Sequence, residues 1–386
     1  MNICIIAQRY PYKDNMEFVF VKKLVDEWAK MGHRCVVFTD FSWTTYLRKR
    51  LEFKPKHYRD EVAPGVFVDV YNPRFLTTKV HFGYFSLDLW LAKRAVERQM
   101  KLLDIEFDFI YCHFFTSSYK VVTYSKEKKI PLFVATGESD LKKLGALEKP
   151  TPSFSKNMFK ALVRGIVSVS TKNKDEAYEL GLIEKEKCQV FPNGTDLSVF
   201  RRLDKRQCRE KLNLPLDTFI ISCVGFFCER KGQNRVLEAV RMLGRSDIKI
   251  IFIGKAAKIE SLELEGDEIL YKGAVYNKDL PTYLCASDIF CLPTKAEGCC
   301  NAVIEALACG LPIISSDLPF NRDVLDDTNS ILIDPNNIKD ISQAIDTLYD
   351  DCELRNRLAK GALAKAEGVS LQNRAKKLLE FIESRL

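Results

Sequence analysis

Two glutamates near the end of the chain, Glu297 and Glu305, are separated by seven residues and lie around the predicted start of a helix. The apolar run 289–292 predicts a buried strand, so Glu297 falls on the loop between that strand and the helix. Asn301 is the predicted N-cap, which places Glu305 in the first helical turn. The spacing therefore predicts two carboxylates beside one helix N-terminus.

This arrangement suits an anionic ligand that also carries hydroxyl groups. Free backbone N–H groups and the helix dipole bind phosphate oxygens, and carboxylates accept hydrogen bonds from sugar diols. A structural alternative stays open for each glutamate: Glu297 as a solvated loop charge, and Glu305 as a residue favoured by the helix dipole. The backbone N–H groups expected to bind phosphate belong to residues 298–303, which include Gly298, Cys299, Cys300 and Asn301.

A second candidate site follows the apolar run 219–224, where Arg230 and Lys231 precede a helix predicted from Arg235 to Leu243. Cations ahead of a helix N-terminus form a reasonable site for a diphosphate group. Solvated loop charges are the alternative interpretation of both side chains. The sequence thus predicts two loops that connect a strand to a helix and can bind an anion.

The elements that must position these loops alternate along the chain. A strand at 3–7, a helix at 18–31 and a strand at 35–38 open the chain, and the pattern restarts at residue 219. Such alternation predicts an α/β fold.

At 386 residues, two domains are expected. We place them at residues 1–200 and 201–370, with the polar stretch 201–213 as a linker. Residues 371–386 are predicted to form a closing helix, for which a return to the first domain is one option.

Three segments resemble the signatures of one enzyme family. The two glutamates, followed by Ala-Leu-Ala-Cys-Gly-Leu-Pro-Ile-Ile at 306–314, resemble the signature of retaining glycosyltransferases of family four, which have the GT-B fold. Residues 192–200 resemble that family's "PNG-D-F" segment, and residues 225–232 resemble its "GR-four residues-KG" motif. The resemblance covers almost the whole chain. It implies an α/β fold of two Rossmann-like, doubly wound parallel-sheet domains that face a central cleft.

The resemblance also implies roles for the residues of both loops. Glu297 is expected to contact the donor sugar and Glu305 the nucleotide ribose. The expected catalytic residues are Glu297, Arg230 and Lys231. The expected donor-binding residues are Glu305, Gly298, Cys299, Cys300, Asn301, Gly225 and Phe226.

The implied activity is transfer of a sugar from a nucleotide diphosphate sugar to a glycan or lipid-linked acceptor, with retention of configuration, in cell-surface polysaccharide biosynthesis. Neither a cofactor nor a metal is expected, because protein cations can stabilise the leaving group and the chain has no Asp-x-Asp pair. Two alternatives stay open: a catalytically silent protein that binds a nucleotide sugar or a glycan, and a GT-B nucleotide-sugar epimerase.

The chain departs from the family pattern at three places. Gly137 stands where the family commonly has a histidine, so Glu138 is the nearest candidate to contact the sugar or the acceptor. Phe226 stands where the family usually has an arginine. The loop after the first strand lacks glycine, and Arg9 and Lys13 could offer charge to the acceptor there. Gly137 and Phe226 keep the silent-binder alternative open.

Residues 43–59 carry six basic residues interleaved with aromatic ones. This mixture is typical of a surface that associates peripherally with an anionic membrane, although an exposed basic loop is the alternative. A nucleic-acid partner is not expected, because it would leave both glutamates unexplained. The formal net charge of +7 allows an anionic partner without requiring one.

The location of the protein is predicted from its first residues and its cysteines. The N-terminus lacks the pattern of a signal peptide, and no window approaches 18 apolar residues. Several of the 13 cysteines lie in apolar runs, as is usual in a reducing compartment. We therefore expect a cytoplasmic protein, with the inner face of the cytoplasmic membrane as one option.

Overall fold

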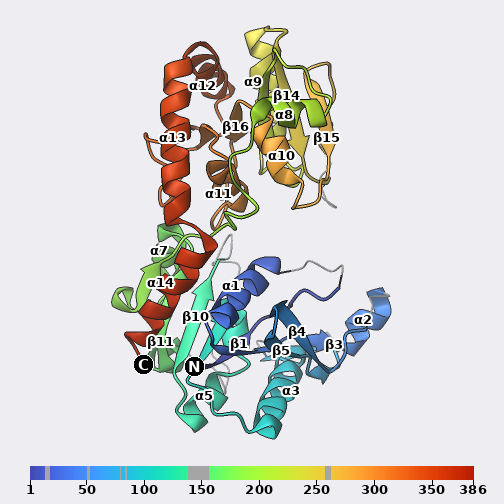
Figure 1. Cartoon of the computed structure of the whole chain (residues 1–386). Helices are drawn as coiled ribbons and strands as arrows, with labels where there is room; N and C mark the ends of the chain where they lie inside the picture. The colour runs from blue at the N-terminus through green and yellow to red at the C-terminus, as the bar shows by residue number, and fades with distance from the viewer. Residues whose placement is uncertain (14–17, 50–52, 79, 83–84, 138–155, 257–261) are drawn as a thin grey trace. The chain divides into compact units, whose positions relative to one another are not determined.

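The computed structural model describes residues 1–13, 18–49, 53–78, 80–82, 85–137, 156–256 and 262–386 (Figure 1). These residues form two compact units. The first unit comprises Met1–Phe191 and Ala375–Leu386, and the second comprises Pro192–Arg374. Each unit is an α/β structure built on a mainly parallel sheet, as the alternation of strands and helices predicts.

The sheet of the first unit is parallel except at one edge, where β4 pairs antiparallel with β5. Two small pairs, β3 (Phe41–Ser42) with β6 (Arg74–Phe75) and β7 (His81–Phe82) with β8 (Phe85–Ser86), lie outside it. The order of the main sheet is β12 (Cys188–Val190), β11 (Val163–Ser168), β10 (Leu132–Thr136), β9 (Phe109–His113), β1 (Asn2–Ile6), β2 (Arg34–Phe38), β5 (Val66–Tyr71) and β4 (His57–Ala63).

Both faces of this sheet are covered, so its central strands are apolar on both sides. Ile3 and Ile5 pack with Trp28 of α1, whereas Cys4 and Ile6 pack on the opposite face. The helices of the unit are α1 (Val19–Lys30), α2 (Trp43–Lys49), α3 (Leu87–Leu103), α4 (Phe115–Ser118), α5 (Val122–Lys128), α6 (Lys156–Leu162), α7 (Thr171–Glu179) and most of α14 (Leu371–Glu383).

The closing helix α14 packs in the first unit from Ala375 onward. Trp28 Nε1 donates to the Ala375 carbonyl at 3.1 Å, and the ring of Phe381 lies 5.5 Å from that of Phe191. The chain enters the second unit at residue 192 instead of 201, because Thr195 exchanges backbone hydrogen bonds with residues 369 and 371 at 3.2 and 2.9 Å.

The sheet of the second unit is parallel throughout its paired strands. Its order is β15 (Ile269–Gly273), β14 (Ile248–Ile253), β13 (Phe219–Val224), β16 (Ile289–Leu292), β17 (Ile313–Ser316) and β18 (Ser330–Ile333). Because β13 and β16 are neighbours, the loops at their carboxyl ends meet at one edge. The helices are α8 (Lys205–Lys211), α9 (Gln233–Leu243), α10 (Leu280–Cys285), α11 (Asn301–Ala308), α12 (Ile338–Asp350) and α13 (Cys352–Gly368).

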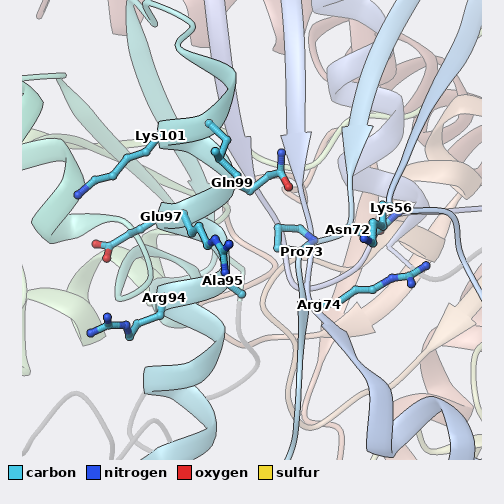
Figure 2. A pocket seen from close by; sticks show the side chains of 11 residues that line it. Lys56, Asn72, Pro73, Arg74, Arg94, Ala95, Glu97, Gln99 and Lys101 are labelled. Carbon is cyan, nitrogen blue, oxygen red and sulfur yellow. The ribbon is translucent and has the colours of Figure 1, made fainter.

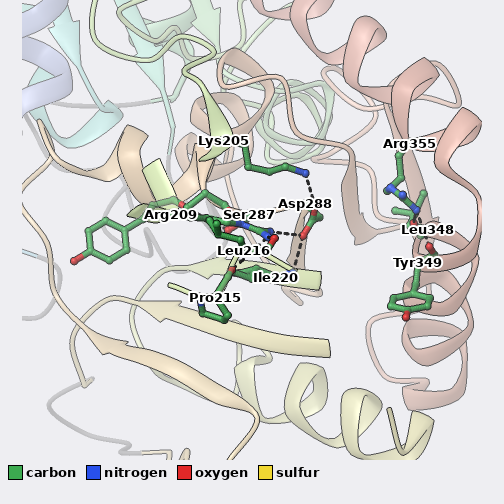
Figure 3. Close-up of polar contacts among 12 residues, drawn as sticks. Lys205, Arg209, Pro215, Leu216, Ile220, Ser287, Asp288, Leu348, Tyr349 and Arg355 are labelled. Carbon is green, nitrogen blue, oxygen red and sulfur yellow. Dashed lines mark hydrogen bonds and ion pairs between the residues drawn. The ribbon is translucent and has the colours of Figure 1, made fainter. Parts of the chain in front are cut away.

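The prediction of a linker at residues 201–213 is wrong. This stretch contains α8, which is capped by Asp204 and anchored by Arg209, a side chain only 3% exposed (Figure 3). The Arg209 guanidinium donates to the carbonyls of Ala286 and Leu216 at 2.8 and 2.6 Å and pairs with Asp288 at 2.7 Å. Most polar residues of this stretch are exposed, and Arg209 is the buried exception that satisfies carbonyls of the second unit.

Candidate active site

The first loop of the site runs from β13 to α9 and carries Arg230 and Lys231. Lys231 is buried, and its aliphatic chain passes within 3.2 Å of the position that a β-carbon on Gly225 would occupy. Gly232 caps α9 with a left-handed φ of 80°, and a β-carbon there would lie 2.8 Å from the Pro293 carbonyl oxygen. A glycine is therefore required where this loop approaches the second one.

The second loop runs from β16 to α11 and carries Glu297. The carboxylate oxygen Oε1 of Glu297 accepts a hydrogen bond from Arg230 Nη1 at 2.6 Å and contacts Lys231 Nζ at 2.8 Å. It also accepts from the Thr294 hydroxyl at 2.8 Å. The three residues predicted as catalytic thus lie together, although Lys231 and Glu297 are 66 positions apart in the sequence.

The electrostatics of this cluster favour the charged forms of Glu297 and Lys231. Burial alone would raise the pKa of the Glu297 carboxyl, but the nearby Lys231 and Arg230 cations and the hydrogen bond from Thr294 hold that pKa below its usual value. Burial alone would lower the pKa of the Lys231 ammonium, but the Cys300 thiol and the Glu297 carboxylate beside it raise that pKa. Two cations facing one carboxylate leave a net positive charge for an anionic ligand.

Arg235 ties the two loops together, and sequence reasoning missed this role. Its Nη1 donates to the Glu229 carbonyl at 3.0 Å, and its Nη2 donates to the Pro293 carbonyl at 2.9 Å. The backbone N–H of Lys295 adds a bond to the Arg230 carbonyl at 2.9 Å. In the sequence, the only sign of this role is an arginine in the first turn of an otherwise amphipathic helix. In the fold, Arg235 is 5% exposed.

The start of α11 differs from the prediction by one residue. Cys300, not Asn301, is the N-cap, because the Asn301 side chain accepts from Asn193 Nδ2 at 2.9 Å instead of capping the helix. The Asn193 N–H donates to Cys299 Sγ at 3.4 Å. Glu305 is half-buried and lies beyond the first turn, which contains no acidic residue. The prediction that Glu305 belongs to the first turn is therefore wrong.

The remaining predicted residues fall into two groups. In the second unit, Phe226 exposes 61% of its surface, while its carbonyl accepts from Gln233 Nε2 at 3.0 Å. In the first unit, Arg9 is half-buried, and Lys13 is exposed with a left-handed φ of 49°. Glu138 lies outside the described residues.

Two family models match consecutive parts of the chain. The model described as Glycosyltransferase Family 4 matches residues 18–199, and the model described as Glycosyl transferases group 1 matches residues 204–365. The chain belongs to the family 4 glycosyltransferases. The resemblance carried by Glu297, Glu305 and the Lys231–Gly232 pair is thereby confirmed.

Two relatives are similar in sequence to this glycosyltransferase, one over most of the chain and the other over about half of it. A Bacillus subtilis (strain 168) protein, named as a teichuronic acid biosynthesis glycosyltransferase, TuaC, is 28% identical over 91% of this chain and 89% of its own length. The UDP-Gal:alpha-D-GlcNAc-diphosphoundecaprenol alpha-1,3-galactosyltransferase of Escherichia coli is 26% identical over 56% of this chain and 59% of its own length. Neither comparison favours the silent-binder or epimerase alternative.

A solved structure supports the fold of this glycosyltransferase. The sucrose-phosphate synthase of Thermosynechococcus elongatus matches with a TM-score of 0.73 and 17% identity, over 99% of this chain and 98% of that chain. The likeness confirms the GT-B fold. At this identity it says nothing of the substrate.

Metal binding and membrane crossing are considered for the described residues of the glycosyltransferase. They contain no group of three or more His, Cys, Asp or Glu side chains arranged to hold a metal ion. Among the same residues, no helix is both long and apolar enough to cross a membrane.

Gly137 has room for a β-carbon. A β-carbon there would meet Phe114 at 3.4 Å and Val169 at 3.5 Å, which are ordinary contact distances. The departure from the family pattern at this position is therefore not imposed by crowding around the β-carbon.

Proposed function

We propose that this glycosyltransferase takes its sugar from a nucleotide diphosphate sugar and transfers it, with retention of configuration, to a glycan or lipid-linked acceptor of cell-surface polysaccharide biosynthesis. The observation that carries the proposal is the contact of Glu297 with Arg230 and Lys231 at the carboxyl edge of a parallel sheet. The names of the relatives support it, since one uses UDP-Gal and a diphosphoundecaprenol acceptor and the other serves teichuronic acid biosynthesis.

The difficult step is departure of the nucleoside diphosphate. The bond from the anomeric carbon to the phosphate oxygen breaks, and the electron pair leaves with the diphosphate. Lys231 and Arg230 stabilise the charge that develops on that oxygen. Glu297 holds both cations side by side, which orients them toward one ligand.

Glu297 holds the hydroxyl groups of the transferred sugar, and Glu305 holds the ribose. The backbone N–H groups from Gly298 to Asn301 contact the diphosphate at the start of α11. The acceptor hydroxyl forms the new bond to the anomeric carbon and passes its proton to the departing phosphate oxygen. In this proposal the protein cations stabilise the leaving group, and no metal ion takes part.

A thermal-shift panel tests the donor class. UDP-, GDP- and ADP-sugars are added without metal to the wild type and to Glu305→Ala. A donor at about 100 times its dissociation constant adds about 2.7 kcal/mol to the free energy of unfolding. We expect one nucleotide series to raise the melting temperature of the wild type but not of the variant. If no series does, the protein does not bind a nucleotide sugar by itself and the silent glycan binder takes precedence.

We also propose that the basic and aromatic stretch at 43–59 associates with an anionic membrane surface. Trp43 and Phe53 pack together at 5.2 Å between ring centres, while Leu47 of α2 exposes 62% of its surface. The stretch therefore combines aromatic rings that pack together with an exposed apolar side chain. Sedimentation with phosphatidylglycerol vesicles should pull down the wild type, and neutralising Arg48, Lys49 and Arg50 should abolish this. Equal sedimentation of both proteins would contradict it.

A further inference from the structure

A cavity of about 900 Å³ lies in the first unit, between α3 and the turn that follows β5 (Figure 2). We call it the α3 pocket. Asn72, Pro73 and Arg74 line one side of it, and residues of α3, among them Arg94 and Lys101, line the other. Figure 2 shows the charged ends of Arg94 and Lys101 directed away from Pro73. All of its lining residues belong to the first unit, whereas the Glu297 cluster belongs to the second.

The lining of the α3 pocket is strongly basic. Among the described residues that line it, the one carboxylate is Glu97, and burial raises the pKa of that carboxyl despite the Lys93 ammonium 3.7 Å away. Lys101 pairs with Glu127 at 3.3 Å, outside the pocket. The cations of the lining are Lys56, Arg74, Arg94, Arg98 and Lys101. Positive charge therefore exceeds negative charge in the pocket, which attracts an anion.

Two of these arginines are held in place by tryptophans. The Arg74 guanidinium lies 4.6 Å from the ring centre of Trp43, and its Nη2 donates to the Lys54 carbonyl at 3.3 Å. The Arg94 guanidinium lies 4.9 Å from the ring centre of Trp90. A guanidinium held by stacking loses little conformational freedom when it binds an oxyanion, and its planar fork matches phosphate oxygens.

Apolar side chains are exposed next to this basic lining. Leu76, two residues after Arg74, exposes 56% of its surface. Leu102 is itself part of the lining and exposes 70% of its surface. A basic pocket bordered by exposed leucines suits a ligand with a phosphate group and an apolar chain.

We propose that the α3 pocket binds the phosphate groups of the acceptor, and that the acceptor is a lipid-linked phosphate whose apolar chain lies on the neighbouring leucines. The proposal rests on the proposed function and specifies the class of its acceptor. It separates two anion sites: the donor diphosphate binds in the second unit, and the acceptor phosphate binds in the first.

Tryptophan fluorescence can report on this pocket selectively. The chain has 3 tryptophans, at positions 28, 43 and 90, and all belong to the first unit. Two of them lie against the pocket arginines, and Trp28 is buried in the core. Binding of inorganic pyrophosphate in the pocket should therefore change the fluorescence in a saturable way, whereas binding at the Glu297 cluster has no tryptophan in its own unit to report it.

The test compares two double variants that each remove two positive charges from a helix of the first unit. Arg94→Gln with Arg98→Gln should weaken pyrophosphate binding about tenfold or more. Lys376→Gln with Lys377→Gln, on exposed positions of α14, should leave it unchanged. No saturable change in the wild type, or equal weakening in both variants, would overturn the proposal.

A second arm distinguishes a lipid-linked phosphate from a soluble one. Phosphatidylcholine vesicles that contain a polyprenyl diphosphate should shift the fluorescence at lower phosphate concentration than free pyrophosphate does. A response to pyrophosphate but not to these vesicles would overturn the lipid-linked part. Two variants separate failure of this proposal from failure of the proposed function. Glu305→Ala should lose stabilisation by the donor and keep the fluorescence response to pyrophosphate. The Arg94 and Arg98 variant should keep stabilisation by the donor and lose the response to pyrophosphate.

Discussion

Replacing Lys231 with methionine removes one buried cation while keeping most of the length of the side chain. Lys231 is 8% exposed, and its Nζ lies 2.8 Å from Glu297 Oε1. Losing one partner of a buried ion pair costs about 3–5 kcal/mol when nothing replaces it. Because Arg230 and Thr294 still contact the Glu297 carboxylate, we expect the free energy of unfolding to fall by about 1–3 kcal/mol.

The effect on catalysis should exceed the effect on folding. Removing a single group that stabilises the leaving-group charge costs about 3 kcal/mol of transition-state stabilisation, or about 100-fold in kcat. The assay measures sugar transfer at saturating donor, alongside urea unfolding of the same preparation. Lys295→Met is the matched control, since Lys295 is 38% exposed and pairs with Glu229 at 3.1 Å. It should cost less than about 1 kcal/mol and leave transfer unchanged.

The pH dependence provides an independent measure of the same ion pair. The pKa of Glu297 is held below its usual value in the folded protein, although burial opposes this, because Lys231 and Arg230 lie beside the carboxylate. The stabilisation is therefore present above the unfolded pKa of about 4.3, and it is lost as the pH falls through the lower folded pKa. In Lys231→Met the folded pKa rises, so stability should decline at a higher pH than in the wild type. Unchanged kcat together with an unchanged acid limb would refute the reasoning.

Three further predictions concern the residues that hold the loops and the second unit in place. Gly232→Ala should lower the free energy of unfolding by about 2 kcal/mol or more in urea denaturation, because the φ of Gly232 is 80° and an added β-carbon would meet the Pro293 carbonyl. The control is Gly244→Ala, at a position with a φ of 65° and no atom within 4 Å of an added β-carbon. It should cost only about 1 kcal/mol. Arg235→Met should reduce kcat about tenfold in the transfer assay, because it releases the Glu229 and Pro293 carbonyls. Arg235→Lys should restore part of the lost activity. Equal activity of the two variants would contradict a positioning role for Arg235. Arg209→Leu should lower the free energy of unfolding by about 2–4 kcal/mol, because Asp288, which is 12% exposed, loses a partner. The control is Arg206→Leu, since Arg206 is 74% exposed. It should cost less than about 0.5 kcal/mol in the same denaturation experiment.

Local sequence predicted the elements well wherever burial on both faces produced continuous apolar runs. The strands at 219–224 and 289–292 are predicted and found at the same residues. The first residue of a helix is predicted less accurately, because a side chain near it can bond to a partner that is distant in sequence. Asn301 bonds to Asn193, which lies 108 residues earlier, and so Cys300 becomes the N-cap. The limits of the two units likewise depend on Thr195, whose backbone partners lie near residue 370.

The sequence by itself determined the family, the α/β class and the two loops on which the candidate chemistry lies, because these follow from local spacing and from the types of neighbouring residues. Only the tertiary structure decided which charges meet. Lys231 and Glu297 come together because β13 and β16 are neighbours in the sheet, and strand order is a long-range property that no window of residues encodes. The same holds for Arg235 and for the α3 pocket, whose walls come from separate elements. Their charges are visible in the sequence, but only folding gives them partners and a cavity.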